Sequence, residues 1–279
     1  MKKIFEIIGF LSLMLFTFTY TSKISMVIKE NDDLLSQIKE VSTQYKKDPI
    51  NATIKDNTIV AGVSGSQIDI DESYSKMKKL NQFNSNLFVY EKVKPDISVA
   101  NNYDKYIVGG IKNEVSIIFL VEENNKIDSI LNILDEYEIK ANFFVDGNWF
   151  ENNNNKIIDL IENDYIIGSL GYNYNYDVSG INWMNTIVTK IGNQNDTYCY
   201  AEVENDKNLN ICKNNKSYTI KPNIIVKNNP LITIKNNLKK GSIISLKIND
   251  EVKNQLPLII EYINSRDYNI VNLEEFLDE

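Results

Sequence analysis

Residues 134–147 read LDEYEIKANFFVDG, and this stretch decides the fold class. Its first part closes an amphipathic segment whose apolar residues, from Ile127 to Leu134, recur at helical spacing. Its second part, residues 141–145, is a short apolar run bounded by polar residues, which is typical of a buried strand. A helix that leads directly into a buried strand is the repeating unit of folds with a parallel sheet.

The same alternation continues on both sides of this stretch, from about Asn113 to Glu279. We predict strands at 115–120, 141–145, 165–168, 198–201, 217–220, 242–248 and 268–271. Helices are predicted at 126–137, 153–162 and 250–265, with a closing turn at 273–277. The repetition predicts an α/β fold with mostly parallel strands wrapped by helices, as a barrel or an open sheet. Functional side chains are then expected at the C-terminal ends of the strands.

The N-terminal segment has the pattern of an export or anchoring sequence. Lys2 and Lys3 precede a largely apolar run over residues 4–20. We predict a signal-anchor or transmembrane segment at 1–22 and a helical stalk at 23–47. A cleaved signal peptide and a buried soluble helix are the alternatives. The prediction places the chain in the cell membrane as a single-pass protein whose body lies outside the cytoplasm.

Residues 48–112 are predicted to form a small N-terminal α+β module ahead of the main domain at 113–279. Its expected elements are a strand at 57–63, a helix at 71–80 and a strand at 87–93. Asp71 is predicted to cap the helix, because the string around it lacks the glycine and the final glutamate of a calcium-binding loop. Gly109 and Gly110 are predicted to mark a linker.

Charge and cysteine content limit the classes of partner. Thirty basic and thirty-eight acidic residues give a net charge of −8. This balance disfavours nucleic acid as a partner, because its binding needs Lys and Arg to neutralise phosphates.

Cys199 and Cys212 are the two cysteines of the chain. In an extracytoplasmic chain they form either one disulfide or a reduced buried pair, and the sequence leaves both open.

Three parts of the sequence resemble the polysaccharide deacetylase family, the NodB-homology type of carbohydrate esterase. The helix and strand that end at 141–147 are followed by Trp149, as in that family. Residues 167–172 and 241–246 are similar to two later strands of the family. The resemblance covers residues 113–279 and implies a distorted (β/α) barrel. It also implies hydrolysis of N- or O-acetyl groups from chitin-like oligosaccharides, peptidoglycan or xylan.

The family's mechanism needs a divalent metal held by one Asp and two His, a second Asp as base and a late His as acid. None of these residue types stands at the matching positions of this chain, which contains no histidine. The base position is Leu120, the metal-binding Asp position is Val121, the two metal-binding His positions are Leu170 and Tyr174, the position of an arginine that steadies the base is Cys199, and the late His position is Lys247. We therefore predict a degenerate member that has no catalytic residues and no metal or other cofactor.

Each replacement side chain has an ordinary structural interpretation beside a chemical one. Glu122 and Glu123 follow the lost aspartates and form either a weak site for a hard cation or the start of a solvated loop. Cys199 has no histidine to activate it as a nucleophile, so we predict a core residue or half of a disulfide. Lys247 is either a desolvated base or, as we predict, a side chain at the rim. The short stretch 174–198 predicts a truncated helix.

The expected function is binding without catalysis, by a membrane-tethered protein that recognises cell-wall glycan or an envelope protein. The candidate glycan-binding residues are Tyr172, Asn173, Tyr174, Tyr176 and Trp149, because aromatic rings offer platforms for sugars and amides bond to hydroxyls. One alternative is an active carbohydrate deacetylase, a hydrolase of the C–N bond of acetylated amino sugars, with an altered site. Another is a structural or assembly partner in an envelope complex, with residues 48–110 as its contact surface.

Overall fold

The computed structural model describes residues 11, 14–19, 32–192 and 194–279, which form two compact units. The described residues within Met1–Pro49 and Gly65–Val93 form unit 1, and those within Ile50–Ser64 and Lys94–Glu279 form unit 2. The predicted anchor at 1–22 lies mostly outside the described residues, as does the first part of the predicted stalk. Within the described residues, no helix combines the length and the apolar character needed to cross a membrane.

Unit 1 consists of two helices and a two-stranded antiparallel sheet. Its elements are α2 (Asp33–Ser42), the 3-10 helix η1 (Thr43–Tyr45), β3 (Gly65–Ile68), α3 (Ile70–Lys78), the 3-10 helix η2 (Ser85–Leu87) and β4 (Tyr90–Val93). α2 packs against α3, and Ile38 of α2 and Met77 of α3 are fully buried. The Asp32 carboxylate accepts hydrogen bonds from the Lys78 ammonium and the Tyr74 hydroxyl. The second half of the predicted stalk therefore belongs to a folded unit.

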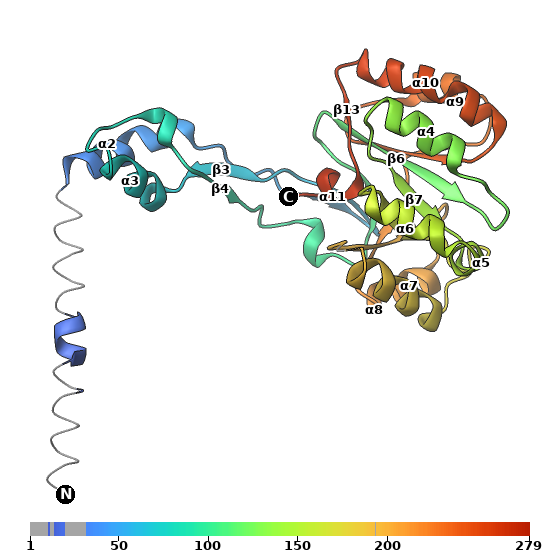
Figure 1. The fold of residues 1–279 in the computed structure, drawn as a ribbon, viewed down its shortest axis with the longest axis horizontal. Coiled ribbons are helices and arrows are strands. Elements are labelled where there is room, and N and C mark those ends of the chain that lie inside the picture. The colour runs from blue at the N-terminus through green and yellow to red at the C-terminus, as the bar shows by residue number, and fades with distance from the viewer. Residues whose placement is uncertain (1–10, 12–13, 20–31, 193) are drawn as a thin grey trace, which may run out of the picture. The chain divides into compact units, whose positions relative to one another are not determined.

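Unit 2 is built on one large, mostly parallel sheet (Figure 1). Its strands are β1 (Thr53–Lys55), β2 (Thr58–Val60), β5 (Tyr106–Gly109), β6 (Glu114–Val121), β7 (Asn142–Val145), β8 (Ile166–Ser169), β9 (Thr197–Tyr200), β10 (Ser217–Ile220), β11 (Ile224–Val226), β12 (Ser242–Lys247) and β13 (Asn269–Ile270). Their order is β1-β2-β5-β10-β9-β8-β7-β6-β12-β11, with β13 beside β6. Strands β1 and β11 end this order without pairing with each other, so the sheet is a curled half-barrel and not a closed one.

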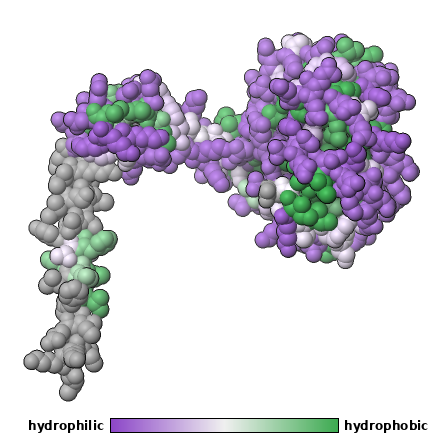
Figure 2. Space-filling view, in the orientation of Figure 1, coloured by the Kyte–Doolittle hydropathy of each residue, from purple (hydrophilic) through white to green (hydrophobic). Residues whose placement is uncertain are grey.

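Most helices of unit 2 cover one face of the sheet, whereas Val99 of η3 and Leu273 and Phe276 of α11 belong to the core of the other face. The helices are η3 (Val99–Asn101), α4 (Asp128–Glu136), α5 (Gly147–Asn152), α6 (Asn154–Glu162), α7 (Val178–Lys190), α8 (Asp206–Asn214), α9 (Pro230–Asn237), α10 (Asp250–Asn264) and α11 (Leu273–Phe276). Because successive strand residues point to opposite faces, Phe119 and Val121 pack with the helices on what we call the helix face. Leu120, Tyr200 and Tyr218 lie in a second core on the opposite, inner face. In the view of Figure 2 the surface of unit 2 is mainly hydrophilic, with a compact hydrophobic patch and smaller hydrophobic areas elsewhere.

Strands β1, β2 and β5 come from residues predicted to form the separate module at 48–112. β2 pairs with β5, and β5 pairs with β10. A domain boundary at residue 113, as predicted, would therefore cut through one continuous sheet. Gly109 and Gly110 do not form a linker. Gly109 ends β5 with a φ of +154°, and the Gly110 N–H donates to the carbonyl of Gly241. Glycine permits this close approach of two backbones. The physical reason for the difference is long-range strand pairing, which a local pattern does not reveal.

Two local predictions are also corrected. The cap of α3 is Asp69, whose carboxylate accepts a hydrogen bond from the Glu72 N–H, and not Asp71. Instead of a truncated helix between Tyr174 and Tyr198, the structure has α7 with 13 residues. The Asp177 carboxylate accepts from the Gly180 N–H and starts this helix at its first turn.

Candidate functional site

Four of the substituted positions lie together near the C-terminal ends of neighbouring strands. Leu120 on β6 pairs in register with Lys247 on β12. Leu170 follows β8 directly, and Tyr174 comes later in the same loop. Leu120 and Leu170 are buried in the inner-face core, with Tyr174 packed against it. The Lys247 side chain is half exposed, which agrees with the predicted position at the rim.

A polar group, which we call the Glu122 cluster, is formed by Lys247, Tyr174 and Glu122. One carboxylate oxygen of Glu122 accepts hydrogen bonds from the Lys247 ammonium and the Tyr174 hydroxyl, each at 2.8 Å. The ammonium also lies 5.7 Å from the centre of the Tyr174 ring, within cation–π range. The hydrogen bond from Lys247 lowers the pKa of Glu122, while burial and the bond to Glu122 raise the pKa of Tyr174. At neutral pH the cluster is thus a carboxylate bonded to an ammonium and a phenol.

The other two substituted positions lie elsewhere. Val121 is buried on the helix face, because successive residues of a strand point to opposite faces and its neighbour Leu120 points to the inner face. Cys199 forms a disulfide with Cys212 of α8, the alternative that the sequence left open beside a reduced pair. Both cysteines belong to a small third core with Tyr176 and Ile181. The disulfide therefore ties α8 to β9.

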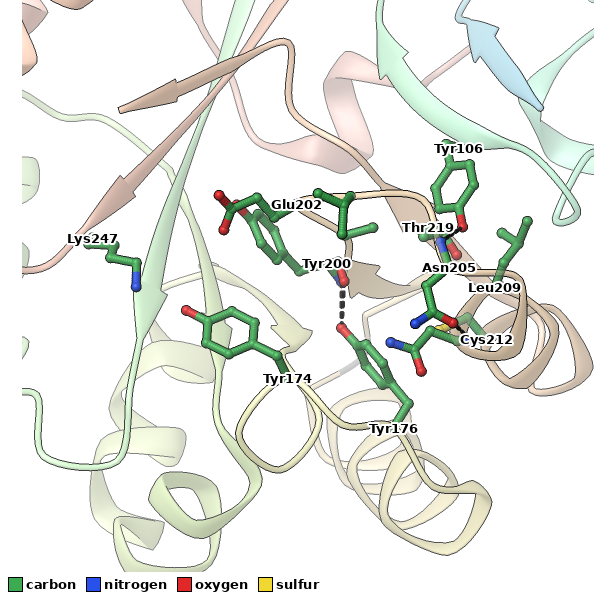
Figure 3. A pocket seen from close by; sticks show the side chains of 13 residues that line it. Tyr106, Tyr174, Tyr176, Tyr200, Glu202, Asn205, Leu209, Cys212, Thr219 and Lys247 are labelled. Carbon is green, nitrogen blue, oxygen red and sulfur yellow. Dashed lines mark hydrogen bonds between the residues drawn. The ribbon is translucent and has the colours of Figure 1, made fainter. Parts of the chain in front are cut away.

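A cleft of about 300 Å³ runs from the Glu122 cluster to α8 (Figure 3). This volume lies at the lower end of the range of small-molecule sites. Its lining includes four tyrosines, Tyr106, Tyr174, Tyr176 and Tyr200, the polar or charged side chains of Glu202, Asn205, Asn208, Thr219 and Lys247, and the apolar side chains of Val203 and Leu209. The loop from Tyr200 to Asn205 and the start of α8 form one wall.

Both charged side chains of the cleft are already paired. Lys247 bonds to Glu122, and Glu202 forms an ion pair with Lys227 at 3.1 Å. The Tyr200 hydroxyl lies 3.3 Å from the Ser245 hydroxyl, and burial raises the pKa of Tyr200 to about 12. The cleft thus presents aromatic faces and neutral hydrogen-bonding groups to a ligand.

Residues 110–215, which hold β6 to β9, match a family model described as polysaccharide deacetylase. This segment belongs to the polysaccharide deacetylase family. The uncharacterized protein YlxY of Bacillus subtilis (strain 168) is 29% identical over 152 residues, which make up 53% of this chain and 48% of that protein. The chain therefore matches about half the length of this curated relative.

Solved structures of the deacetylase family share the fold. BA3943 of Bacillus anthracis, described as a CE4 family pseudoenzyme, gives a TM-score of 0.65 at 21% identity over 89% of this chain and 96% of that one. PdaA of Bacillus subtilis, described as a family 4 carbohydrate esterase, gives a TM-score of 0.54 at 16% identity over 82% of this chain and 97% of that one. The family predicted from the sequence and its mixed α/β architecture are confirmed.

The metal of the deacetylase family does not fit the residues of this chain. Leu120, Val121 and Leu170 carry no donor atom, and the Tyr174 hydroxyl is engaged with Glu122. Among the described residues, no group of three or more His, Cys, Asp and Glu side chains could hold a metal ion. Glu122 directly follows β6 and its side chain is about half exposed, as predicted for the start of a solvated loop, and it also accepts the two hydrogen bonds of the Glu122 cluster.

The predicted glycan-binding residues of the deacetylase domain are only partly brought together. Tyr174 lines the cleft, whereas Tyr172 bonds through its hydroxyl to Glu151 and Asn173 is exposed outside the lining. Trp149 is 2% exposed, and its indole N–H donates to the Asn125 carbonyl. Tyr176 is 6% exposed, with its hydroxyl bonded to backbone groups of Ser169 and Tyr200. Burial therefore corrects the prediction for Trp149 and leaves Tyr176 as a wall of the cleft.

Sequence reasoning missed Tyr106, Tyr200, Asn205 and Thr219 as lining residues. Asn205 is the N-cap of α8 and accepts from the Asn208 N–H, and this capping pattern at 205–208 was readable in the sequence. Tyr200 and Thr219 lie at the C-terminal ends of β9 and β10, where the fold predicts functional side chains. Tyr106 lies outside the matched deacetylase segment, so the family resemblance gave no signal for it.

Proposed function

We propose that this protein is a membrane-anchored, extracytoplasmic member of the deacetylase family that binds cell-wall glycan and does not hydrolyse it. The observation that carries the proposal is the Glu122 cluster, which stands where the family's catalytic groups belong. The Lys247 ammonium, the Tyr174 hydroxyl and one carboxylate oxygen of Glu122 are bonded to one another, and the neighbouring Leu120 and Leu170 are apolar. The chain has no histidine, and these positions offer no set of metal ligands that would activate a water nucleophile.

The cleft supports glycan as the ligand class. The Tyr174 and Tyr200 rings lie with their centroids 6.3 Å apart at its Glu122 end and offer apolar faces with polar tips. Asn205 and Asn208 add amides, which donate to and accept from hydroxyl groups. BA3943, a pseudoenzyme by its description, has the same fold over 89% of this chain. That likeness is consistent with loss of catalysis in this family.

The N-terminal run supports membrane anchoring. Residues 4–20 are largely apolar and follow Lys2 and Lys3. Within the described part of this run, Leu15, Phe16 and Phe18 are exposed by 70%, 69% and 75%. A hydrocarbon environment would remove this apolar surface from water. Fractionation of cells that express the full chain tests the anchor: we expect recovery with membranes after a high-salt wash, and recovery in the wash contradicts it.

Binding and catalysis are tested together on the purified full chain in mild detergent. We expect saturable binding of chitotetraose and insoluble peptidoglycan, without acetate release in the presence of zinc. Tyr174→Leu is expected to weaken binding about tenfold, or about 1.4 kcal/mol, because the ring face is lost. Tyr174→Phe keeps the ring, and Tyr90→Leu in unit 1 is the matched control for a surface tyrosine. EDTA-sensitive acetate release by the wild-type chain would overturn the proposal.

A further inference from the structure

Three apolar side chains follow one another along the outer side of α7. Trp183, Ile187 and Ile191 are spaced four residues apart, so they lie on one side of the helix. Ile191, the C-cap residue, is 63% exposed, Trp183 is 39% exposed and Ile187 is partly buried. The helix has no charged residue from Val178 to Thr189. An outer helix side that is aromatic and aliphatic without charge has the composition of a contact surface.

Helix α6 extends this apolar surface. Its Ile158 is 47% exposed, and its Ile161 is partly buried. A Cβ atom placed on Gly192 would lie 3.2 Å from Cγ1 of Ile161, so the chain that leaves α7 touches α6 there. The surface is the compact hydrophobic patch in Figure 2, over α6 and α7 of Figure 1. A contiguous exposed patch of this kind marks an interaction site. We call it the α6/α7 patch, and it consists of Ile158, Ile161, Trp183, Ile187 and Ile191.

Carboxylates border the α6/α7 patch on one side. Glu162, Asp164 and Glu274 line a hollow of about 380 Å³ together with two isoleucines of the patch. A second hollow, of about 520 Å³, shares Glu274 and is lined by four further acidic residues and one lysine, Lys94. Burial and the neighbouring Glu274 raise the pKa of Asp196 in this second hollow, because both disfavour its negative charge. A positively charged partner would offset the repulsion between these carboxylates.

The α6/α7 patch and its acidic border lie at the other end of the sheet from the cleft. Tyr165 of the first hollow directly precedes β8, and Asp196 of the second directly precedes β9. Strands β8 and β9 are parallel, so both hollows are at the N-terminal ends of strands. The Glu122 cluster lies near the C-terminal ends. A ligand in the cleft therefore leaves the patch accessible.

The two parts of this surface define the chemistry of the partner. Apolar side chains at helical spacing on two neighbouring helices are complementary to the apolar side of a further helix. The acidic border favours positive charge beside that apolar side. A bilayer is less suitable, because the carboxylates repel anionic lipids. A second copy of the chain is also less suitable, because a symmetric contact would bring the same carboxylates in from both copies.

We propose that the α6/α7 patch binds an amphipathic helix of another protein, with the apolar side of that helix against Trp183, Ile187 and Ile191. Lysine or arginine side chains of the same helix lie toward Glu162 and Asp164. This inference is independent of the proposed binding of glycan. It adds a protein partner of defined chemistry at a surface remote from the cleft.

The probe is a stapled helical peptide about 14 residues long, with leucine on one side and lysine on the other. One control peptide has glutamate in place of lysine, and another has the leucines and lysines in scrambled order. The full chain is held in phosphatidylcholine nanodiscs, and empty nanodiscs provide the blank. We expect the leucine–lysine peptide to bind about tenfold more tightly than either control. Equal binding of the three peptides overturns the proposal. Absence of binding also overturns it, and is the result expected if lipid or a second copy covers the patch.

A matched pair of double variants assigns the binding to the α6/α7 patch. Ile158→Asn with Ile191→Asn removes exposed apolar surface, so we expect about tenfold weaker binding of the leucine–lysine peptide at an unchanged unfolding temperature. Ile232→Asn with Leu258→Asn is the control, because these side chains are 60% and 50% exposed on α9 and α10. Unchanged binding in the first variant, or an equal loss in both, overturns the proposal.

A second pair of variants tests the charge of the border. Glu162→Gln with Asp164→Asn should weaken binding of the leucine–lysine peptide and reduce its dependence on salt. Asparagine suits position 164, whose φ is +57°. Glu251→Gln with Asp267→Asn is the control, because Asp267 has a φ of +58° and lies outside both hollows. A wild-type affinity that does not fall as salt is added overturns the role of basic side chains in the partner.

Discussion

The two ends of the cleft differ in how their polar atoms are satisfied. At the Glu122 end, one carboxylate oxygen of Glu122 accepts from both Lys247 and Tyr174, so the three side chains are bonded to one another. At the end beside α8, the Thr219 hydroxyl is buried without a hydrogen-bond partner among the described residues. A buried polar atom without a partner lowers stability, whereas bonded polar atoms do not. The two ends of the cleft therefore differ in how far the protein itself satisfies their polar side chains.

The largest expected effect comes from rebuilding ligands at the Glu122 end. Leu120→Asp, Leu170→His and Tyr174→His together place one carboxylate and two imidazoles on the inner face, which is the donor set of a zinc site. We expect one zinc per chain by elemental analysis. Zinc at about a thousandfold excess over its dissociation constant should raise the unfolding free energy by about 4 kcal/mol.

The control for this variant uses the neighbouring residue of the same strand. Val121→Asp with the same two histidines should not bind zinc, because Val121 points to the helix face. Equal zinc binding by both triple variants would mean that the alternation of β6 does not decide which residue reaches the site.

The second effect concerns the disulfide that ties α8 to β9. Cys199→Ala with Cys212→Ala opens a loop closed over a separation of 13 residues, and a loop of this size contributes about 3 kcal/mol. We expect the urea midpoint of unit 2 to fall accordingly, and chitotetraose affinity to fall with it, because α8 carries one wall of the cleft. Unchanged stability and affinity would show that the packing of α8 is sufficient by itself.

A smaller effect is expected from the ion pair of the Glu122 cluster. Lys247→Met and Glu122→Gln, alone and combined, give a double-mutant cycle for this pair. Both side chains are about half exposed, so we expect a coupling free energy of about 0.2–1 kcal/mol. A coupling near zero would mean that solvent competes fully for the pair and that the cluster does not resist a ligand.

The smallest effect is the pH dependence of the same group. The hydrogen bond from Lys247 lowers the folded-state pKa of Glu122, so its stabilisation is complete above the unfolded pKa of about 4.3 and is lost as pH falls through the folded pKa. Solvent screening limits the change to a few tenths of a kcal/mol. Urea unfolding between pH 7 and about pH 3 should show a shallower decline for Glu122→Gln than for wild type. A steeper decline of stability in Glu122→Gln than in wild type would contradict the predicted direction of the effect.

Local patterns predicted much of the sheet from sequence. The strand at 217–220 has the predicted bounds, and the helix at 250–265 differs by one residue. These elements carry apolar residues at regular strand or helix spacing, so neighbouring residues suffice to recognise them. The pairing of β5 with β10 joins residues more than a hundred positions apart, and no local pattern encodes such a contact.

The candidate site was predicted less well, for reasons of backbone geometry. The predicted glycan-binding residues include three tyrosines of the loop after β8, where Gly171, Asn173 and Tyr174 all have positive φ. These left-handed residues turn the chain, so Tyr176 points into the third core and Tyr172 points away from the cleft. The bonding state of Thr219 depends on which groups surround it in three dimensions, and a sequence does not display that. The presence of Val121, Leu170 and Tyr174 at the family's metal-ligand positions, by contrast, can be seen in the sequence itself.

The strand order has a practical consequence for how the molecule can be divided. The recognised segment 110–215 ends in space at β9 on one side and β6 on the other, because β10 and β12 come from later in the chain. A fragment cut at those limits would expose two apolar strand edges and would invite aggregation. Any truncated form intended for crystallisation must therefore retain residues 50–64 together with 94–279. The segment that matches the family model is shorter than the compact unit to which it belongs.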